Sequence, residues 1–170
     1  MDEKLTHMDE AGRARMVDVG EKAVTRRRAV AEGRVRISPK LAEAIQRNAL
    51  AKGNLLEVAR LAGIQAAKRT DELIPLCHGL PLDAVHVEAW VDDGFVHLRA
   101  EAITNWKTGV EMEALTAVSV AALTVIDMGK AIDKGMVIEA IRLLEKTGGR
   151  GGPYHAEANK GGKGEVNDDA

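Results

Sequence analysis

The sequence predicts an α+β fold in which helices pack against one face of a mostly antiparallel sheet. Apolar and polar residues alternate over residues 84–91, and the turn sequence "DDG" leads into a strand-like stretch at 95–103, which together indicate a hairpin. A long apolar stretch with helical spacing begins after residue 110. A strand-like segment at 17–37 precedes these elements and another at 136–146, also compatible with a helix, follows them. We therefore expect the order strand, two helices, hairpin, helix and strand.

The composition disfavours nucleic-acid-binding, secreted and membrane proteins. The chain has 170 residues with 24 Lys and Arg against 26 Asp and Glu, a formal net charge of −2, whereas nucleic-acid-binding domains are usually strongly basic. The single cysteine, Cys77, excludes an internal disulfide and fits a reducing compartment. No N-terminal stretch resembles a signal peptide, and the apolar runs are shorter than a membrane span. We expect a cytoplasmic protein that binds neither nucleic acid nor membrane.

The distribution of apolar residues predicts one domain over residues 1–155. Residues 1–15 are polar and lack a clear period, so we expect a loose N-terminal arm. Residues 156–170 contain almost no apolar side chains and are expected to form a disordered tail. Because aromatic residues make up only 2% of the chain, the core must consist of small aliphatic side chains, which also suit packing between subunits.

The first strand, predicted over residues 17–37, stops at a Ser-Pro pair that also signals the start of a helix. Ser38 is a typical N-cap, and the proline after it fits the first helical turn. We expect this helix to run to Lys52, with Gly53 as its C-terminal stop.

A second helix is predicted from Asn54 to about Thr70. Asn54 is followed three residues later by Glu57, which is the spacing of a capping box. Pro75 and Pro81 then impose an irregular connection before the hairpin.

The long helix carries a narrow polar seam on an otherwise apolar surface. Thr108 and Glu111 have the spacing of a capping box, so we expect the helix to open there. At about 100° per residue, seven polar residues fall within roughly 140° of one another. They are Glu113, Thr116, Ser119, Thr124, Asp127, Lys130 and Lys134.

Two interpretations of this seam remain open. In the first, the seam faces water and Asp127 with Lys130 forms an ordinary surface pair of little energetic value. In the second, its small hydroxyl groups line a cleft or a subunit interface, since a solvated face normally carries Lys and Glu. Glu113 and Asp127 are fourteen residues apart, about 21 Å along a helix, so a small ligand within one chain would not reach both.

A proline-bounded turn, "LIPLCHGLPL", places Cys77 and His78 before the hairpin. No second cysteine is present to complete a Cys/His zinc site, so we expect no metal centre and predict Cys77 to be a small buried apolar residue. His78 is either an ordinary hydrogen-bonded histidine or a group that contacts phosphate or exchanges protons. Farther along, the glycine-rich stretch "EKTGGRGG" offers Lys146 and Arg150 as a weak candidate for anion binding.

Several long motifs, taken together, resemble one known family. "AGIQAAKRTDELIPLCH", "KTGVEMEALTAVSVAALTVIDMGKAIDKGMVI" and "RLLEKTGGRGG" resemble the cyclic pyranopterin monophosphate synthases of molybdenum-cofactor biosynthesis. The resemblance covers roughly residues 7–154 and keeps one order throughout. It implies a ferredoxin-like α+β fold and a hexamer built as a trimer of dimers, with active sites shared between subunits. It also implies conversion of 3′,8-cyclo-7,8-dihydro-GTP to the cyclic pyranopterin with release of pyrophosphate, without a cofactor except possible Mg²⁺ on the triphosphate.

The same resemblance assigns candidate site residues motif by motif. The catalytic candidates are Asp127, Lys130 and Lys52. The substrate-binding candidates are Leu76, Cys77, His78, Met112, Glu113 and, less specifically, Arg27 and Lys146. If the two lysines lie close together and are partly desolvated, their pKa values fall and they exchange protons near neutral pH.

Two other function classes compete with this assignment. A non-catalytic, oligomeric nucleotide-binding scaffold would use the polar seam only for assembly and would release no pyrophosphate. An RNA-binding α+β domain would need aromatic residues for base stacking on its strands, and this chain has few aromatic residues.

Overall fold

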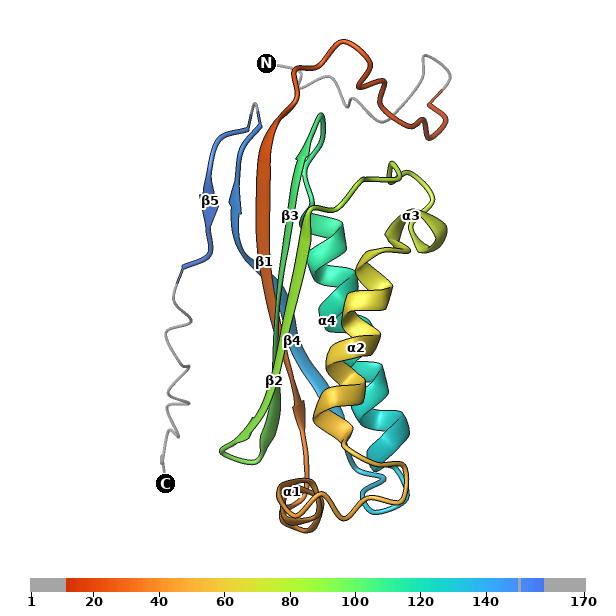
Figure 1. Cartoon of the computed structure of the whole chain (residues 1–170), viewed down its shortest axis with the longest axis vertical. Helices are drawn as coiled ribbons and strands as arrows, with labels where there is room; N and C mark the ends of the chain where they lie inside the picture. The colour runs from red at the N-terminus through yellow and green to blue at the C-terminus, as the bar shows by residue number, and fades with distance from the viewer. Residues whose placement is uncertain (1–11, 150, 158–170) are drawn as a thin grey trace, which may run out of the picture.

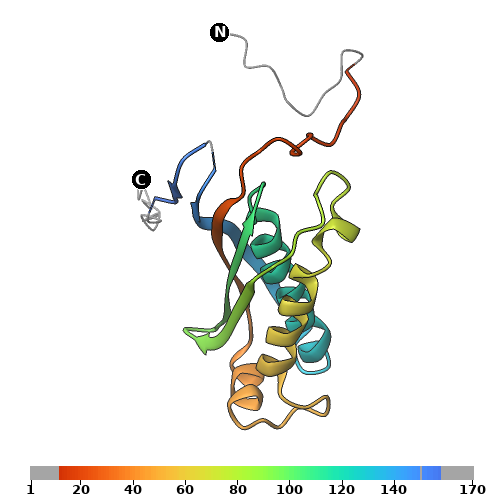
Figure 2. The same ribbon diagram turned by 45° about the horizontal axis from the view of Figure 1, so that its top comes forward.

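The computed structural model describes residues 12–149 and 151–157. From the N-terminus the elements are β1 (Thr25–Arg36), α1 (Pro39–Gln46), α2 (Leu55–Ala67), α3 (Thr70–Leu73), β2 (Ala84–Asp92), β3 (Phe95–Trp106), α4 (Glu111–Gly129), β4 (Val137–Thr147) and β5 (Tyr154–His155). The strands form one antiparallel sheet in the order β2-β3-β1-β4-β5, and α2 and α4 lie side by side on one face of it (Figures 1 and 2). This confirms the predicted α+β architecture, and the order from β1 to β4 is the β-α-β-β-α-β pattern of ferredoxin-like folds.

Small side chains fill the space between the sheet and α4. Eight alanines of β1, β3 and α4 are at most 1% exposed: Ala29, Ala31, Ala100, Ala102, Ala114, Ala117, Ala121 and Ala122. Two glycines bring the layers closer still. A Cβ on Gly33 of β1 would lie 2.8 Å from a methyl group of Val118, and one on Gly63 of α2 would lie 2.9 Å from the carbonyl oxygen of Ala117. The helices therefore pack on the sheet with almost no clearance.

The predicted hairpin is confirmed in its strands and its turn. Asp92 pairs with Phe95, which leaves a two-residue loop of Asp93 and Gly94. Both loop residues have positive φ, 45° and 76°, as a type I′ turn requires. The inward-facing residues of this hairpin, among them Val87 and Val96, are buried under the helices.

The first strand starts later than predicted. Regular pairing begins at Thr25 rather than at residue 17. The preceding residues form a turn instead, because the amide of Gly20 donates to the Asp18 side chain and the amide of Lys22 donates to the Val19 carbonyl. Most of the expected arm at residues 1–15 and most of the expected tail at 156–170 lie outside the described residues.

The first helix is also shorter than predicted, since α1 ends at Gln46 rather than Lys52. Its start is confirmed, with the side chain of Ser38 accepting from the amide of Leu41. The stop is Asn48, whose φ of 50° lies in the left-handed region that asparagine tolerates after a helix. Gly53 has a φ of 92°, but it lies in the loop that follows.

The start of α2 is confirmed, because the side chain of Asn54 accepts from the amide of Glu57. The helix ends at Ala67, and the segment expected to be irregular begins with the short helix α3. The carboxylate of Glu57 pairs with Arg60 on the same helix, so the structure shows only the Asn54 half of the predicted capping box.

The predicted capping box of α4 is wrong. The N-cap is Val110, which makes no side-chain cap bond, and Thr108 lies two residues earlier. The carboxylate of Glu111 lies beside Gly109 and pairs with Lys146 of β4 at 3.2 Å. The last segment is a strand, β4, as favoured from the sequence.

By length and composition α4 is apolar enough to cross a membrane, contrary to the prediction that the apolar runs are too short. More than half of its most apolar window, 56%, is buried within the fold. Because the core helix of a soluble protein passes the same test, this property is weak evidence for a membrane span.

Candidate functional site

The C-terminal end of α4 carries a carboxylate held between two lysines. Lys52 Nζ lies 2.6 Å from Asp127 Oδ2, and Lys130 Nζ lies 2.7 Å from Asp127 Oδ1. Lys52 also donates to the backbone carbonyl oxygen of Asp127 at 3.1 Å. The structure thus brings together the three catalytic candidates, although Lys52 and Asp127 are 75 residues apart in the chain. We call these three residues the aspartate–lysine cluster.

Local backbone features place each of these groups. Lys130 is the C-cap of α4, where a cation is favoured by the partial negative charge of the helix end. Asp127, in the last helical turn, is disfavoured by the same field and is compensated by the two ammonium groups. Lys52 is presented by the loop between α1 and α2, shaped by the left-handed Gly53 and anchored by the cap at Asn54.

The aspartate–lysine cluster is strongly coupled but open to solvent. Hydrogen bonds from Lys130 and then Lys52 lower the pKa of Asp127 to about 2, so the carboxylate is ionised at neutral pH. The side chains of Lys52, Asp127 and Lys130 are 51%, 57% and 60% exposed. The two lysines therefore share one carboxylate, but within one chain they are not desolvated.

A second group of candidates lines a cavity of about 450 Å³ at the opposite end of α4. Its walls come from the turn before β2, the first turn of α4 and the segment before β1. The lining includes Leu76, Cys77, His78, Met112 and Glu113, together with Val17, Val19, Lys22 and Glu111. We call this cavity the Glu113 pocket.

Glu113 is the most buried charged residue of the described part of the chain, at 4% exposure. Burial, followed by repulsion from Glu111 and Asp71, raises its pKa to about 7. Burial also raises the pKa of the Cys77 thiol, with Glu113 and Asp71 contributing. Cys77 is only partly buried, however, so the prediction of a buried cysteine is wrong. The pocket therefore offers a carboxyl group that exchanges a proton near neutral pH.

His78 is held by the segment that precedes β1. Its Nε2 atom lies 2.9 Å from the carbonyl oxygen of Val17. Lys107 donates to the carbonyl of Gly20 and fixes the same segment from the other side. Residues 17–22 therefore form one wall of the Glu113 pocket, which the sequence did not indicate.

The raised pKa of Glu113 predicts a pH dependence of folding stability. The native state keeps this proton between the ordinary pKa of 4.5 and about 7, whereas the unfolded state loses it. The free energy of unfolding should thus decrease as pH rises through this window, by up to about 3 kcal/mol, and stay low above pH 7. In the Glu113→Gln variant this component should vanish.

Urea denaturation of both proteins at pH 5 and pH 8 measures the effect. The pKa shift of Asp127 acts only at lower pH, because a depressed carboxyl pKa affects stability as pH falls below its ordinary value. Equal losses of stability between pH 5 and pH 8 in the parent and in Glu113→Gln would contradict the assignment.

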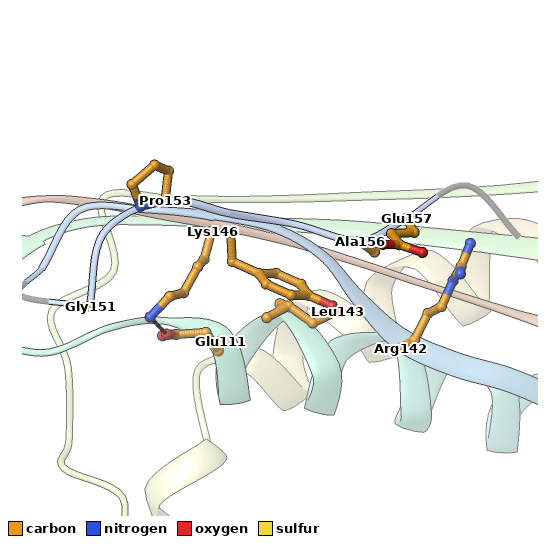
Figure 3. A pocket seen from close by; sticks show the side chains of 9 residues that line it. Glu111, Arg142, Leu143, Lys146, Gly151, Pro153, Ala156 and Glu157 are labelled. Atoms are coloured by element: carbon orange, nitrogen blue, oxygen red, sulfur yellow. Dashed lines mark ion pairs between the residues drawn. The ribbon is translucent and has the colours of Figure 1, made fainter. Parts of the chain in front are cut away.

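Lys146 and Arg27 lie at the same end of the molecule as Glu113. Lys146 pairs with Glu111, which lines both the Glu113 pocket and a neighbouring cavity of about 580 Å³ (Figure 3). Leu143 and Pro153 form part of the apolar wall of that second cavity. Arg27 donates to the carbonyl of Trp106 at 3.4 Å, and a Cβ on Gly149 would lie 2.0 Å from its guanidinium, so the glycine-rich turn closes directly over this arginine.

The two groups of candidates do not meet within one chain. Glu113 lies in the first turn of α4 and Asp127 in the last, fourteen residues or about 21 Å apart along the helix. The structure therefore shows one polar centre at each end of α4. Arg150, the remaining cation of the glycine-rich stretch, lies outside the described residues.

A sequence profile of the MoaC family matches residues 16–149, which span β1 to β4 and contain both polar centres. The chain belongs to the MoaC family.

Curated relatives are similar to this chain over almost their whole length. A protein of Thermomicrobium roseum is 56% identical over 156 residues, covering 91% of this chain and 94% of its own. A protein of Novosphingobium aromaticivorans is 58% identical over 153 residues, covering 89% of this chain and 97% of its own. A protein of Streptomyces griseus is 54% identical over 158 residues, covering 93% of this chain and 89% of its own. All three are named cyclic pyranopterin monophosphate synthase.

Two features of this MoaC-family chain were not anticipated from sequence. Lys22 and Val17 enter the Glu113 pocket, and Glu111 bridges to Lys146 where a capping role was predicted. No local sequence pattern predicts either contact, because each joins segments that are far apart in the chain. Within residues 12–149 and 151–157, no three His, Cys, Asp or Glu side chains gather as a metal site would.

Proposed function

We propose that this protein is a cyclic pyranopterin monophosphate synthase that converts 3′,8-cyclo-7,8-dihydro-GTP to the cyclic pyranopterin and releases pyrophosphate. The observation that carries the proposal is 54–58% identity to proteins of that name over nearly the full length of both partners. The two polar centres support it, because the reaction needs both a ring-binding pocket and groups that move protons.

The Glu113 pocket is suited to the guanine-derived ring. Glu113 can accept hydrogen bonds from ring N–H groups when ionised and donate one when protonated, and its pKa of about 7 makes both forms accessible. Met112 and Leu76 supply apolar surface beside it, and His78 and Cys77 complete the wall. These five residues are our candidates for binding the ring and the sugar.

The aspartate–lysine cluster is suited to proton transfer. Because the carboxylate of Asp127 binds both ammonium groups, it fixes their positions and balances one of their two charges. Closure of the site around the cluster would remove solvent from Lys52 and Lys130 and place their ammonium groups, which are proton and hydrogen-bond donors, against the reacting atoms. Lys146 and Arg27 are the candidates for holding the triphosphate and offsetting the charge of the departing pyrophosphate.

We further propose that one active site is built from two chains, within a hexamer formed as a trimer of dimers. Since about 21 Å of helix separates the two centres, one substrate does not contact both in one chain. A neighbouring chain that supplies its aspartate–lysine cluster to the Glu113 pocket removes this difficulty and also provides the desolvation that the single chain lacks. The resulting enzyme would work in the cytoplasm.

The direct test is incubation of the purified protein with the cyclised nucleotide. Release of one pyrophosphate per nucleotide, with formation of the cyclic phosphate product, is the expected result. Tight binding without pyrophosphate release would instead support the competing class, a nucleotide-binding scaffold.

A further inference from the structure

A cavity of about 250 Å³ lies on the face of the sheet that α2 and α4 do not cover (Figure 1). Gly33 of β1 faces Val118 of α4, and because side chains alternate along a strand, its neighbours on β1 point to the other face. The polar and aromatic side chains of the lining come from all four long strands: Glu32, Arg34, Trp90, His97 and Arg142. None of the residues in the two polar centres lines this cavity, which we call the Arg34 cavity.

Two buried nitrogen atoms of the Arg34 cavity make no hydrogen bond. In the part of the chain that the structure describes, Nε of Arg34 and Nε2 of His97 are the buried side-chain atoms in this condition. Arg34 of β1 and His97 of β3 are direct cross-strand partners, so their side chains are neighbours on one face. Because buried polar atoms in folded proteins are nearly always hydrogen-bonded, this pair of nitrogen atoms indicates a binding site.

Aromatic rings hold both of these groups in place. The ring of His97 stacks on that of Trp90, with centroids 5.3 Å apart and planes at 12°. The guanidinium of Arg34 lies over the ring of Phe95, 4.2 Å from its centroid. The two donors are therefore positioned before a ligand binds, which lowers the entropic cost of binding. Trp90 itself is 42% exposed, so part of its surface remains to contact a ligand.

The backbone beside the cavity is strained. The register of β1 against β4 shifts between Glu32 and Arg34, where β4 forms a bulge. Ala140 lies in this bulge and lines the cavity, and its φ of 54° is a left-handed conformation that alanine rarely adopts. The other non-glycine residues with positive φ among those described, Asn48 and Asp93, are of types that tolerate it. Strained residues of this kind cluster at functional sites such as ligand clamps.

The charges around the cavity favour an anionic ligand. Arg142 donates to Glu32, whereas the carboxylate of Glu139 pairs with both Arg34 and Arg36. Three guanidinium groups thus share two carboxylates. One further carboxylate would balance the third guanidinium and would accept a hydrogen bond from Nε of Arg34, which can only donate.

We propose that the Arg34 cavity binds a small organic carboxylate with a flat apolar body. One carboxylate oxygen accepts from Nε of Arg34 and the other from Nε2 of His97, in the tautomer that carries its proton there. The apolar body lies against the exposed surface of Trp90. Because the cavity shares no residue with either polar centre, this inference does not depend on the proposed function.

Titration of the protein with benzoate tests this site, with the NMR signal of the Trp90 indole N–H as the readout. Benzoate should bind saturably, and benzamide, which has the same shape without the charge, should bind at least about tenfold more weakly. Arg34→Gln and His97→Phe should each lower the affinity for benzoate about tenfold or more, the usual effect of losing a hydrogen bond to a charged group.

Arg36→Gln is the matched control. It removes the other arginine that pairs with Glu139, two residues along the same strand, but Arg36 does not line the cavity and is 56% exposed. Its loss should change the affinity for benzoate less than about threefold, because exposed charges interact weakly through water. Circular dichroism verifies that each variant is folded.

The possible outcomes decide both the site and its ligand. No saturable binding of benzoate, or equal affinity for benzoate and benzamide, would overturn the proposal. Binding of inorganic phosphate but not benzoate at the Trp90 signal would overturn the carboxylate assignment. A lower native mass of folded Arg34→Gln in light scattering would assign the cavity to a contact between copies of the chain and overturn the proposal. A parent protein that binds benzoate at this signal but releases no pyrophosphate would refute the proposed function and leave the Arg34 cavity supported.

Discussion

Replacing Asp127 with asparagine is expected to lower the rate of pyrophosphate release by about 10²–10⁴-fold, the usual contribution of a positioned acid–base group. The amide keeps the size of the side chain but loses the negative charge that holds Lys52 at 2.6 Å and Lys130 at 2.7 Å. Without it the two ammonium groups repel each other and separate. Because Asp127 is exposed within the chain, the substitution should leave the fold intact.

Steady-state kinetics with the cyclised nucleotide measures this effect. Glu43→Gln is a suitable control, because it neutralises another exposed helix carboxylate, which pairs with Arg47 and belongs to neither centre. It should retain the parent rate. An Asp127→Asn enzyme as fast as the parent would remove Asp127 from the mechanism, and a Lys130→Ala enzyme with raised KM but normal kcat would make Lys130 a phosphate-holding group.

Mixing two defective variants should restore activity if the active site is shared. Asp127→Asn damages the aspartate–lysine cluster, whereas Glu113→Gln damages the pocket that the neighbouring chain would complete. In a randomly mixed population of dimers half are mixed, and each mixed dimer has one site with both parts intact. Activity should therefore recover to about one quarter of the parent value, even when each variant alone is inactive.

Co-refolding of equal amounts of the two variants, followed by the pyrophosphate assay, provides the measurement. The control is co-refolding of two differently tagged Asp127→Asn preparations, which should stay inactive. If each chain contained a complete site, the mixture would show only the average of the two variants, and the shared-site proposal would fail.

Much of the fold follows from local sequence signals. The hairpin was predictable because alternating residues flank Asp93 and Gly94, a pair that accepts the positive φ values of a type I′ turn. The starts of α1 and α2 were predictable because Ser38 and Asn54 have side chains that bond a backbone amide three residues ahead. In these places the local preference and the tertiary structure agree.

The errors arose where a distant partner competes with a local one, or where a second local signal acts before the expected one. Glu111 has the spacing of a capping box, but Lys146 of β4 offers its carboxylate an ion pair. The segment before β1 has strand-like composition, yet the side chain of Asp18 bonds a nearby amide and the carbonyl of Val17 meets the ring of His78. Gly53 looked like the end of α1, although Asn48 had already ended it.

The candidate site was predictable in its residues but not in its geometry. Resemblance to the family singled out Lys52 and Asp127, yet nothing in the local sequence indicates that residues 75 positions apart form an ion pair. Periodicity placed Glu113 on the polar seam of α4 but did not predict its burial, because the side chains that cover it come from the turn before β2.

The alanine-lined contact between α4 and the sheet has a consequence for how such enzymes can vary. With side chains this short and Gly33 against Val118, the helix has no room to slide along the strands or to rotate about its own axis. The distance along α4 between Glu113 and Asp127 is consequently fixed within the chain. In the proposed shared site, a change that enlarges one of these alanines would shift both polar centres of the chain and so would misalign two active sites with a single substitution.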